Sequence, residues 1–302
     1  MPRPLPCTTT AAELTARLQD SGTPLVCGVV NVTPDSFSDG GRFFARSAAV
    51  EHALRLVEEG ADVIDIGGES TRPGSRRPNE HEELDRVLPV VAEVVERTGC
   101  AVSVDTSRPA VMNAAVDAGA VMVNDVRGLR EPGALEAVAS RGVTVCVSHM
   151  SGEPGTMQLA PAYDDVVADV ASYLADRAAA CVRAGVEPSS IVLDPGFGFG
   201  KTLKHNLTLL SGLGDLTALG FPVMAGISRK SMLGEITGRP VDERLPASLA
   251  AGLVAAENGA RMLRVHDVSA TRDALAVWEA VRAIRDAQPA GGGSYSRISQ
   301  TR

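Results

Sequence analysis

Polar side chains follow almost every short apolar run of this 302-residue chain. In chain order these residues are Asn31, Asp65, Asp105, Asn124, Asp125, His149, Asp194, Ser228, Arg229, Lys230, Arg264 and His266. Any one of them could begin a turn or cap a helix, because Asn, Asp and Ser commonly do both. So many at equivalent positions favour a functional set, in which hydrogen-bond acceptors are combined with cations.

Within this set, Asp105, Asn124 and Asp194 supply paired hydrogen-bond acceptors. Such side chains can bind a flat ring that carries adjacent N–H donors, such as an aminopyrimidine. Lys230 and Arg264, which come late in the chain with His266, supply cationic or donor groups. The residue types therefore predict an acceptor-rich floor beside a cationic side, which suits a nitrogen heterocycle with an anionic tail.

The segment from Asp194 to Thr202 is rich in glycine but does not fit a nucleotide-binding loop. The spacing from Gly196 to Gly200 is one residue too short for a P-loop, and the dinucleotide-binding pattern is absent. Phe197 and Phe199 could pack a flat substrate ring or belong to the core, and the sequence leaves both readings open.

Motifs of other catalytic classes are missing. The spacings of zinc sites do not occur around the histidines, and no G-x-S-x-G segment provides a nucleophilic serine. A magnesium ion held by Asn or Asp together with substrate phosphates fits the composition better.

Eight apolar runs, separated by stretches of helical periodicity, must position these residues. They are 25–30, 63–66, 101–104, 121–123, 143–147, 191–193, 223–225 and 262–265. Eight β-then-α units predict an α/β fold, a single (β/α)8 TIM barrel, with a doubly wound sheet as the alternative. In a barrel all carboxyl ends of the strands meet at one face, where active sites are built and where phosphates often bind near the last two strands.

Two of the predicted βα loops are long, and span residues 32–42 and 67–78. Ordinary βα loops have about two to six residues, so loops of this length are typical of lids or binding loops.

Residues 23–287 are predicted to form one domain, with an N-terminal extension at 1–22 and a flexible tail at 288–302. Thr10 and Glu13 have capping-box spacing, which predicts a short helix in the extension. The net charge of −8 argues against nucleic-acid and anionic-membrane partners. Five cysteines without CxxC spacing, together with the lack of an apolar membrane span or signal peptide, favour a cytoplasmic protein.

Eight segments of the chain, taken together, resemble the dihydropteroate synthase family. They are 28–41, 67–74, 103–106, 124–128, 149–150, 193–201, 228–232 and 264–268, and they occur in the order of the family. The resemblance implies a (β/α)8 barrel that condenses 6-hydroxymethyl-7,8-dihydropterin pyrophosphate with para-aminobenzoate to 7,8-dihydropteroate and pyrophosphate. It also implies Mg²⁺ as cofactor and a homodimer.

The resemblance assigns roles residue by residue. The pterin is expected at Asp105, Asn124, Asp194 and Lys230, and Mg²⁺ at Asn31. The pyrophosphate is expected at Thr71, Arg72, Arg264, Val265 and His266, and the aminobenzoate at Phe37, Thr71, Pro73, Phe199, Ser228 and Lys230. The catalytic residues implied are Asn31, Asp35, Lys230, Arg264 and His266.

Two other functions are compatible with parts of this pattern. A pterin-dependent methyltransferase barrel would share the pterin floor but would not need the segment 228–231 or the two long loops. A non-catalytic pterin-binding paralogue would keep the floor and would be expected to lose a loop or a cation. The main departure from the family is Ser148, where many relatives have Met, and little effect is expected because His149 and Met150 remain.

Overall fold

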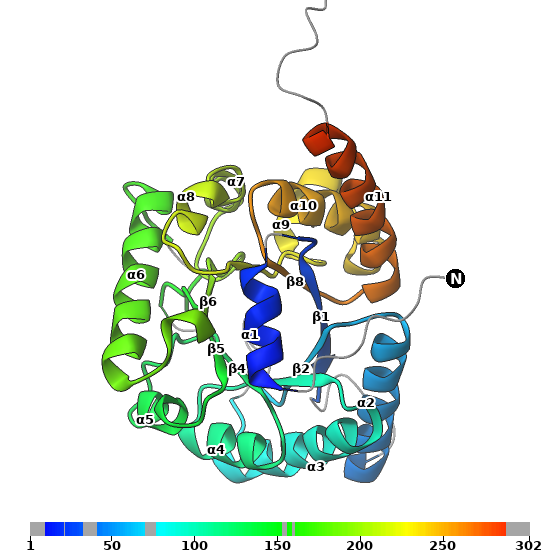
Figure 1. Ribbon diagram of the computed structural model, residues 1–302, viewed down its shortest axis with the longest axis vertical. Helices are drawn as coiled ribbons and strands as arrows, with labels where there is room; N and C mark the ends of the chain where they lie inside the picture. Colours follow the sequence, from blue (N-terminus) through cyan, green and yellow to red (C-terminus); the bar gives the residue numbers. More distant parts are fainter. Residues whose placement is uncertain are drawn as a thin grey trace, which may run out of the picture.

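Parallel strands alternate with helices along the computed structural model, which describes residues 10–20, 22–32, 41–69, 77–152, 156–158 and 161–287. The strands are β1 Leu25–Asn31, β2 Val63–Gly67, β3 Ala101–Asp105, β4 Met122–Asp125, β5 Thr144–Ser148, β6 Ile191–Asp194, β7 Met224–Ala225 and β8 Met262–Val265. The helices outside them are α2 Gly41–Glu58, α3 Glu80–Thr98, α4 Pro109–Asp117, α5 Ala134–Ala139, α6 Val166–Ala184, α7 Leu203–Ser211, α8 Leu213–Thr217, α9 Ser231–Thr237, α10 Leu245–Glu257 and α11 Val268–Ala287. The helices surround the strands when the molecule is viewed along the barrel (Figure 1).

The eight strands form one sheet in the order β6-β5-β4-β3-β2-β1-β8-β7, with every pair parallel. A single parallel bridge between Leu193 and Val223 joins β6 to β7 and closes the ring. This confirms the predicted barrel and excludes the doubly wound sheet. All eight predicted runs coincide with strands, within one or two residues at their ends.

Helical periodicity determines which faces pack against the strands. In α6, Val166, Val170, Leu174 and Cys181 are buried, at the period that the sequence predicts. Asp165 begins the helix by accepting hydrogen bonds from the backbone N–H groups of residues 167 and 168. The strand residues between the two layers are mostly Val and Ile, so the main core lies between the sheet and the ring of helices.

The helix predicted near Thr10 is α1 Ala11–Gln19, and it begins with the expected capping box between Thr10 and Glu13. It lies across the middle of the ring in Figure 1. Leu14 and Leu18 are buried in a second core that fills the barrel with the first residues of several strands, such as Leu25 and Val63. The N-terminal segment therefore closes the end of the barrel opposite the carboxyl ends of the strands.

Polar contacts fasten this helix to the barrel. An Arg17 guanidinium nitrogen lies 2.5 Å from a carboxylate oxygen of Asp62, and Arg261 Nε donates to the backbone carbonyl of Leu18 at 3.4 Å. Within the described part of the chain, no helix is long and apolar enough to span a membrane.

Candidate active site

The floor of the site joins four strands through Arg264 on β8. Its Nε donates to an oxygen of Asp65 on β2 at 2.6 Å, and a terminal guanidinium nitrogen donates to Asp105 on β3 at 2.8 Å. Asn124 on β4 donates its side-chain N–H to the same Asp65 oxygen at 3.1 Å. These contacts are possible because the carboxyl ends of parallel strands meet at one face of the barrel.

Two buried acceptors on this floor are left over. Asp65 Oδ1 and Asn124 Oδ1 accept no hydrogen bond from any residue in the described part of the chain. An unsatisfied buried acceptor costs roughly 1–3 kcal/mol. A ligand with N–H donors would remove this cost, so the floor suits the edge of an aminopyrimidine ring.

Opposing influences set the pKa of Asp105. Burial raises the pKa of its carboxyl to about 7, while the positive charge of Arg264 opposes the rise and Asp65 adds to it. Below that pH the carboxyl gains a proton and loses acceptor capacity toward a ligand.

Asp194, at the end of β6, turns into the glycine-rich segment. Its Oδ1 accepts from the backbone N–H of Gly196 at 2.7 Å, and Ser148 donates to its other oxygen at 3.4 Å. Burial raises the pKa of this carboxyl, and Lys230 is among the cations that lower it. Ser148, the main departure from the family pattern, therefore supports a predicted pterin residue.

Lys230 stands over the face of the Phe199 ring, with 4.0 Å between Nζ and the ring centre. Burial lowers the pKa of this amine to about 8, and Asp194 counteracts the effect. Phe197, in contrast, is 1% exposed and belongs to the core. The structure thus separates the two phenylalanines that the sequence could not distinguish.

On the cationic side, His266 and Ser228 are joined. The Ser228 hydroxyl lies 3.1 Å from His266 Nδ1 and accepts from the His266 backbone N–H at 3.2 Å. Burial lowers the pKa of His266 to about 4, and the charge of Arg264 lowers it further. His266 is neutral at pH 7, so it can act there as a hydrogen-bond donor but not as a cation.

A strained backbone turn carries Lys230. Arg229 has a φ of 59°, which is rare for a residue with a side chain. Its guanidinium makes two contacts with Asp267, at 2.5 and 3.0 Å. This ion pair holds the turn after β7 against the end of β8, so Ser228 and His266 remain adjacent.

The predicted residues that the structure describes lie at or just after the carboxyl ends of the strands, and contacts join Arg264 to Asp105, His266 to Ser228 and Lys230 to Phe199. Arg264 is already engaged by two carboxylates. Val265 lies beside it on β8, and Asn31 ends β1 next to Gly67 of β2. Asp35, Phe37, Thr71, Arg72 and Pro73 lie outside the described residues. The sequence reasoning assigned no role to Asp65 or Lys201, although Asp65 belongs to the polar strand ends and Lys201 follows the last glycine of its motif.

The donor set fits a loosely held magnesium ion. No group of three or more His, Cys, Asp or Glu side chains that could hold a metal occurs among the described residues. Mg²⁺ commonly retains waters and binds through one or two protein oxygens plus substrate phosphates. The side-chain oxygen of Asn31, at the end of β1, can provide such a ligand.

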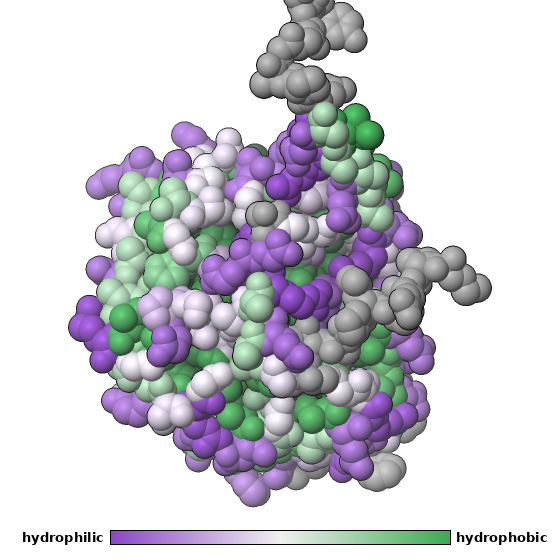
Figure 2. Space-filling view, in the orientation of Figure 1, coloured by the Kyte–Doolittle hydropathy of each residue, from purple (hydrophilic) through white to green (hydrophobic). Residues whose placement is uncertain are grey.

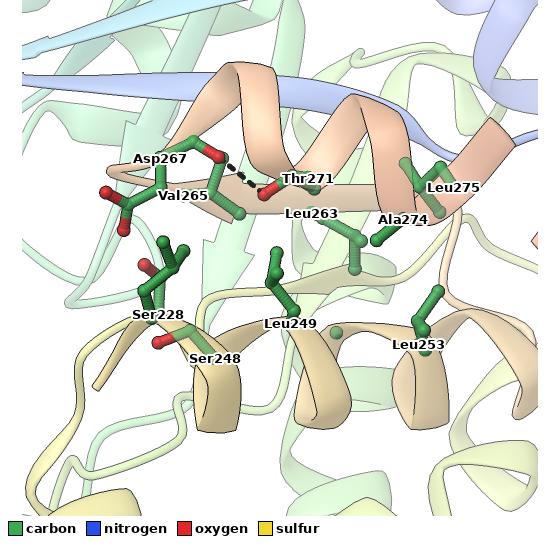
Figure 3. Close-up of a pocket in the computed structure, with 12 residues that line it drawn as sticks. Ser228, Ser248, Leu249, Leu253, Leu263, Val265, Asp267, Thr271, Ala274 and Leu275 are labelled. Atoms are coloured by element: carbon green, nitrogen blue, oxygen red, sulfur yellow. Dashed lines mark hydrogen bonds between the residues drawn. The ribbon is translucent and has the colours of Figure 1, made fainter. Parts of the chain in front are cut away.

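A small cavity behind Ser228 does not belong to the substrate site. Its volume is about 10 Å³, whereas a single buried water needs about 10–15 Å³. Figure 3 shows Ser228, Val265 and Asp267 at one end of it and Leu253 and Leu275 at the other. Neither a pterin nor an aminobenzoate fits there, so the open face of the barrel is the candidate site.

Comparison with known proteins agrees with this geometry. Residues 27–266 match the family model described as pterin binding enzyme. The dihydropteroate synthase of Haemophilus influenzae is 48% identical over 86% of this chain and 95% of its own. The structure of Xanthomonas albilineans dihydropteroate synthase with 4-aminobenzoic acid has a TM-score of 0.83 and 54% identity, and covers 87% of this chain and 94% of that one.

A second structure of the Xanthomonas albilineans enzyme, in complex with 7,8-dihydropteroate, has a TM-score of 0.80 and 52% identity over 87% of this chain and 95% of that one. The family match, the identity over nearly the whole of each relative and the shared barrel lead to one conclusion: the chain belongs to the pterin-binding enzyme family, as a member of its dihydropteroate synthases.

Proposed function

We propose that this protein condenses 6-hydroxymethyl-7,8-dihydropterin pyrophosphate with para-aminobenzoate to give 7,8-dihydropteroate and pyrophosphate, as a transferase of folate biosynthesis. The observation that carries the proposal is the pair of buried acceptors Asp65 Oδ1 and Asn124 Oδ1, which have no hydrogen-bond partner among the described residues and lie beside Asp105 at the carboxyl ends of the strands. Relatives crystallised with 4-aminobenzoic acid and with 7,8-dihydropteroate support it.

The pterin occupies the floor. Its ring N–H groups donate to Asn124, Asp105 and Asp194, whose acceptors converge from β4, β3 and β6. Arg264 forms ion pairs with both Asp65 and Asp105. Its positive charge offsets the repulsion between the two carboxylates, which allows both to lie on one buried floor. The ring is thereby fixed with its methylene group toward the cationic side.

The leaving pyrophosphate lies at Arg264 and His266. As the C–O bond breaks, its electron pair passes to the pyrophosphate oxygen, and charged or N–H donors placed there stabilise the negative charge that develops. The electron-rich pterin ring stabilises the cation left on the methylene carbon. The unprotonated nitrogen of the arylamine then forms the new C–N bond and loses a proton, so no strong base is required.

The aminobenzoate packs near Phe199, Lys230 and Ser228. In support, Lys230 stands over the Phe199 ring, and Ser228 comes two residues before Lys230 in the chain. The predicted loop residues Phe37, Thr71 and Pro73 complete this site and limit access of water, which would otherwise capture the cation. Val265, Thr71 and Arg72 complete the surroundings of the pyrophosphate, and Asp35 of the first long loop completes the catalytic set.

Asn31 would supply a side-chain oxygen to Mg²⁺, which commonly binds one or two protein oxygens together with substrate phosphates. When bound, the ion offsets negative charge on the pyrophosphate. The protein acts in the cytoplasm on small molecules, without a nucleic-acid or membrane partner.

The protein is a homodimer that associates through α11. Val277, Val281 and Ile284 are 67%, 49% and 63% exposed and follow one another at helical spacing, and Val254 on the adjacent α10 is 46% exposed. Figure 2 shows hydrophobic side chains along α11 on the surface of the molecule. An exposed apolar stripe of this kind is typical of a surface that a second copy covers.

Substitution of Lys230 and of Asp105 tests the proposal. Lys230→Ala and Asp105→Asn should each lower turnover at least about a hundredfold, because each removes a charged contact worth about 3 kcal/mol to the reacting complex. Circular dichroism and thermal unfolding would establish that both variants are folded. Turnover near that of the wild type in both folded variants would contradict the assignment of the site.

A further inference from the structure

Lys201 is a buried amine at the centre of the glycine-rich turn between β6 and α7. It is 4% exposed and lies just before Thr202, which begins α7. Its Nζ lies 2.9 Å from His149 Nδ1, 3.0 Å from the carbonyl oxygen of Gly196 and 3.1 Å from that of Phe199. An ammonium group has three N–H donors, and here all three meet an acceptor.

These acceptors belong to two separate segments. Gly196 and Phe199 lie in the turn that follows Asp194, whereas His149 follows β5. The turn lies directly on the end of β5, because a side chain added at Gly196, where φ is 66°, would place Cβ 1.9 Å from the His149 carbonyl oxygen. At Gly200 the added Cβ would lie 2.5 Å from the carbonyl oxygen of Ser151. Lys201 therefore fastens together two segments that only glycine allows to approach so closely.

His149 is suited to receive this hydrogen bond. Since its Nδ1 accepts from Lys201, the ring proton is on Nε2. Burial lowers the pKa of the ring to about 3, and the charge of Lys201 lowers it further, so the ring is neutral at pH 7. The edge-to-face contact with Tyr173, at 4.9 Å between ring centres, fixes the plane of the imidazole.

The held turn carries two residues of the substrate site. Asp194 accepts from the backbone N–H of Gly196, and Gly196 is one of the residues whose carbonyl Lys201 holds. Phe199, the other such residue, presents its ring to Lys230. Burial disfavours the charged form of Lys201 and lowers its pKa to about 7. The three hydrogen bonds offset part of the cost of burying this amine.

We propose that Lys201 is a positioning residue, which fixes Asp194 for the pterin and Phe199 for the aminobenzoate by holding the turn 195–200 against the end of β5. It acts through backbone carbonyls and does not touch the reacting atoms. The inference rests on the proposed function for the identity of the ligands. Arg264 and His266 lie on and just after β8. Among the described residues their hydrogen bonds reach Asp65, Asp105 and Ser228 and none of the residues 195–200, so we expect the pyrophosphate side to be independent of Lys201.

The test compares Lys201→Met, which keeps length but removes the donors, with Lys204→Met, an exposed lysine three residues further on. Dissociation constants for 6-hydroxymethylpterin, para-aminobenzoate and pyrophosphate with Mg²⁺ would be measured by calorimetry, with the aminobenzoate titrated into protein that holds pterin and pyrophosphate. We expect Lys201→Met to weaken pterin and aminobenzoate binding about tenfold each, because the turn that positions Asp194 and Phe199 loses hydrogen bonds from a charged group. Pyrophosphate binding should stay within about twofold, and Lys204→Met should match the wild type in all three.

Unchanged pterin and aminobenzoate affinities in a folded Lys201→Met variant would overturn the proposal. An equal loss for pyrophosphate would overturn it too, because it would indicate general damage to the barrel. These binding measurements remain decisive if the wild type binds the ligands but forms no dihydropteroate, which would count against the proposed function alone.

Nuclear magnetic resonance of the imidazole nitrogens in the wild type provides a measurement that does not depend on the folding of a variant. In the wild type, His149 should be the neutral Nε2–H form from pH 5 to pH 8, since the pKa of its ring lies near 3. In Lys201→Met the pKa should rise toward its ordinary value, because a positive neighbour has gone, and in Lys204→Met it should not. A wild-type ring protonated on Nδ1 would show that Lys201 does not donate to it, and would refute the proposal.

Discussion

Replacement of Arg264 by Met should destabilise the protein in a pH-dependent way. Arg264 is the only cation in direct contact with Asp65 and Asp105 among the described residues, and its substitution leaves two carboxylates on one floor. Met keeps most of the apolar volume of the side chain, so the effect isolates the loss of charge and of hydrogen bonds.

The magnitude follows from burial. Breaking a buried ion pair by removing one partner costs about 3–5 kcal/mol. Asp65 is 1% exposed, but Arg264 and Asp105 are 21% and 17% exposed, so the lower end applies. We expect a loss of about 3 kcal/mol in the free energy of unfolding at pH 8, which is more than a hundredfold in the folding equilibrium.

The sign of the pH dependence comes from Asp105. Its pKa is already raised to about 7 in the folded protein, and Arg264 holds it down. Without Arg264 it rises further, so the folded variant binds a proton that the unfolded chain, with a carboxyl pKa near 4, does not bind. Stability then increases as pH falls, and the loss should be smaller at pH 6 than at pH 8.

Urea unfolding of wild type and variant at both pH values would measure this. Arg261→Met is the matched control, because Arg261 donates to backbone carbonyls, including that of Gly22, and not to carboxylates. It should cost about 1 kcal/mol at either pH. A loss below about 1 kcal/mol for Arg264→Met, or an equal loss at pH 6 and pH 8, would refute the reasoning.

Three further predictions concern the floor, the closed end and the outer surface. Affinity for 6-hydroxymethylpterin, which lacks the titrating pyrophosphate, should fall as pH drops from 7.5 to 5.5, since Asp105 gains a proton below a pKa of about 7. Calorimetry of Asp105→Asn should give weaker binding that does not change with pH in this range. The same pH dependence in the wild type and the variant would contradict the assignment. Leu18→Ala should lower the free energy of unfolding by about 2–5 kcal/mol, because Leu18 is 1% exposed in the core. The turnover number should stay unchanged, because Leu18 lies at the end of the barrel opposite the site. A fall in turnover of the folded variant would be inconsistent with this separation. Val277→Glu should convert the proposed dimer into a monomer, measured by light scattering, since it places a charge in the apolar stripe of α11. A dimer of unaltered stability would exclude that surface.

Much of the fold could be predicted because parallel strands buried on both faces are short, continuous apolar runs. Leu25–Asn31 and Thr144–Ser148 were recognisable in this way. The predicted run at 223–225 was less complete, since only Met224 and Ala225 form a strand and Val223 makes a single bridge. Sequence periodicity indicates that a segment is buried, but it does not determine how many backbone hydrogen bonds the segment makes.

The site was predictable to the level of strand ends, and less so to the level of partners. Asp105, Asn124 and Asp194 do lie at one face, as the barrel requires. Arg264 pairs with Asp65 across the barrel, although the two residues are 199 positions apart in the sequence. No local sequence pattern encodes such a contact. Lys201 was hidden for a similar reason, because its partner His149 follows a different strand.

The most direct test of the proposed reaction follows pyrophosphate and dihydropteroate in one tube, starting from 6-hydroxymethyl-7,8-dihydropterin pyrophosphate. The account predicts that both products appear in step, and only when para-aminobenzoate and Mg²⁺ are present together. Pterin binding without formation of dihydropteroate under these conditions would contradict it, and would favour a non-catalytic pterin-binding protein or a pterin-dependent methyltransferase barrel instead.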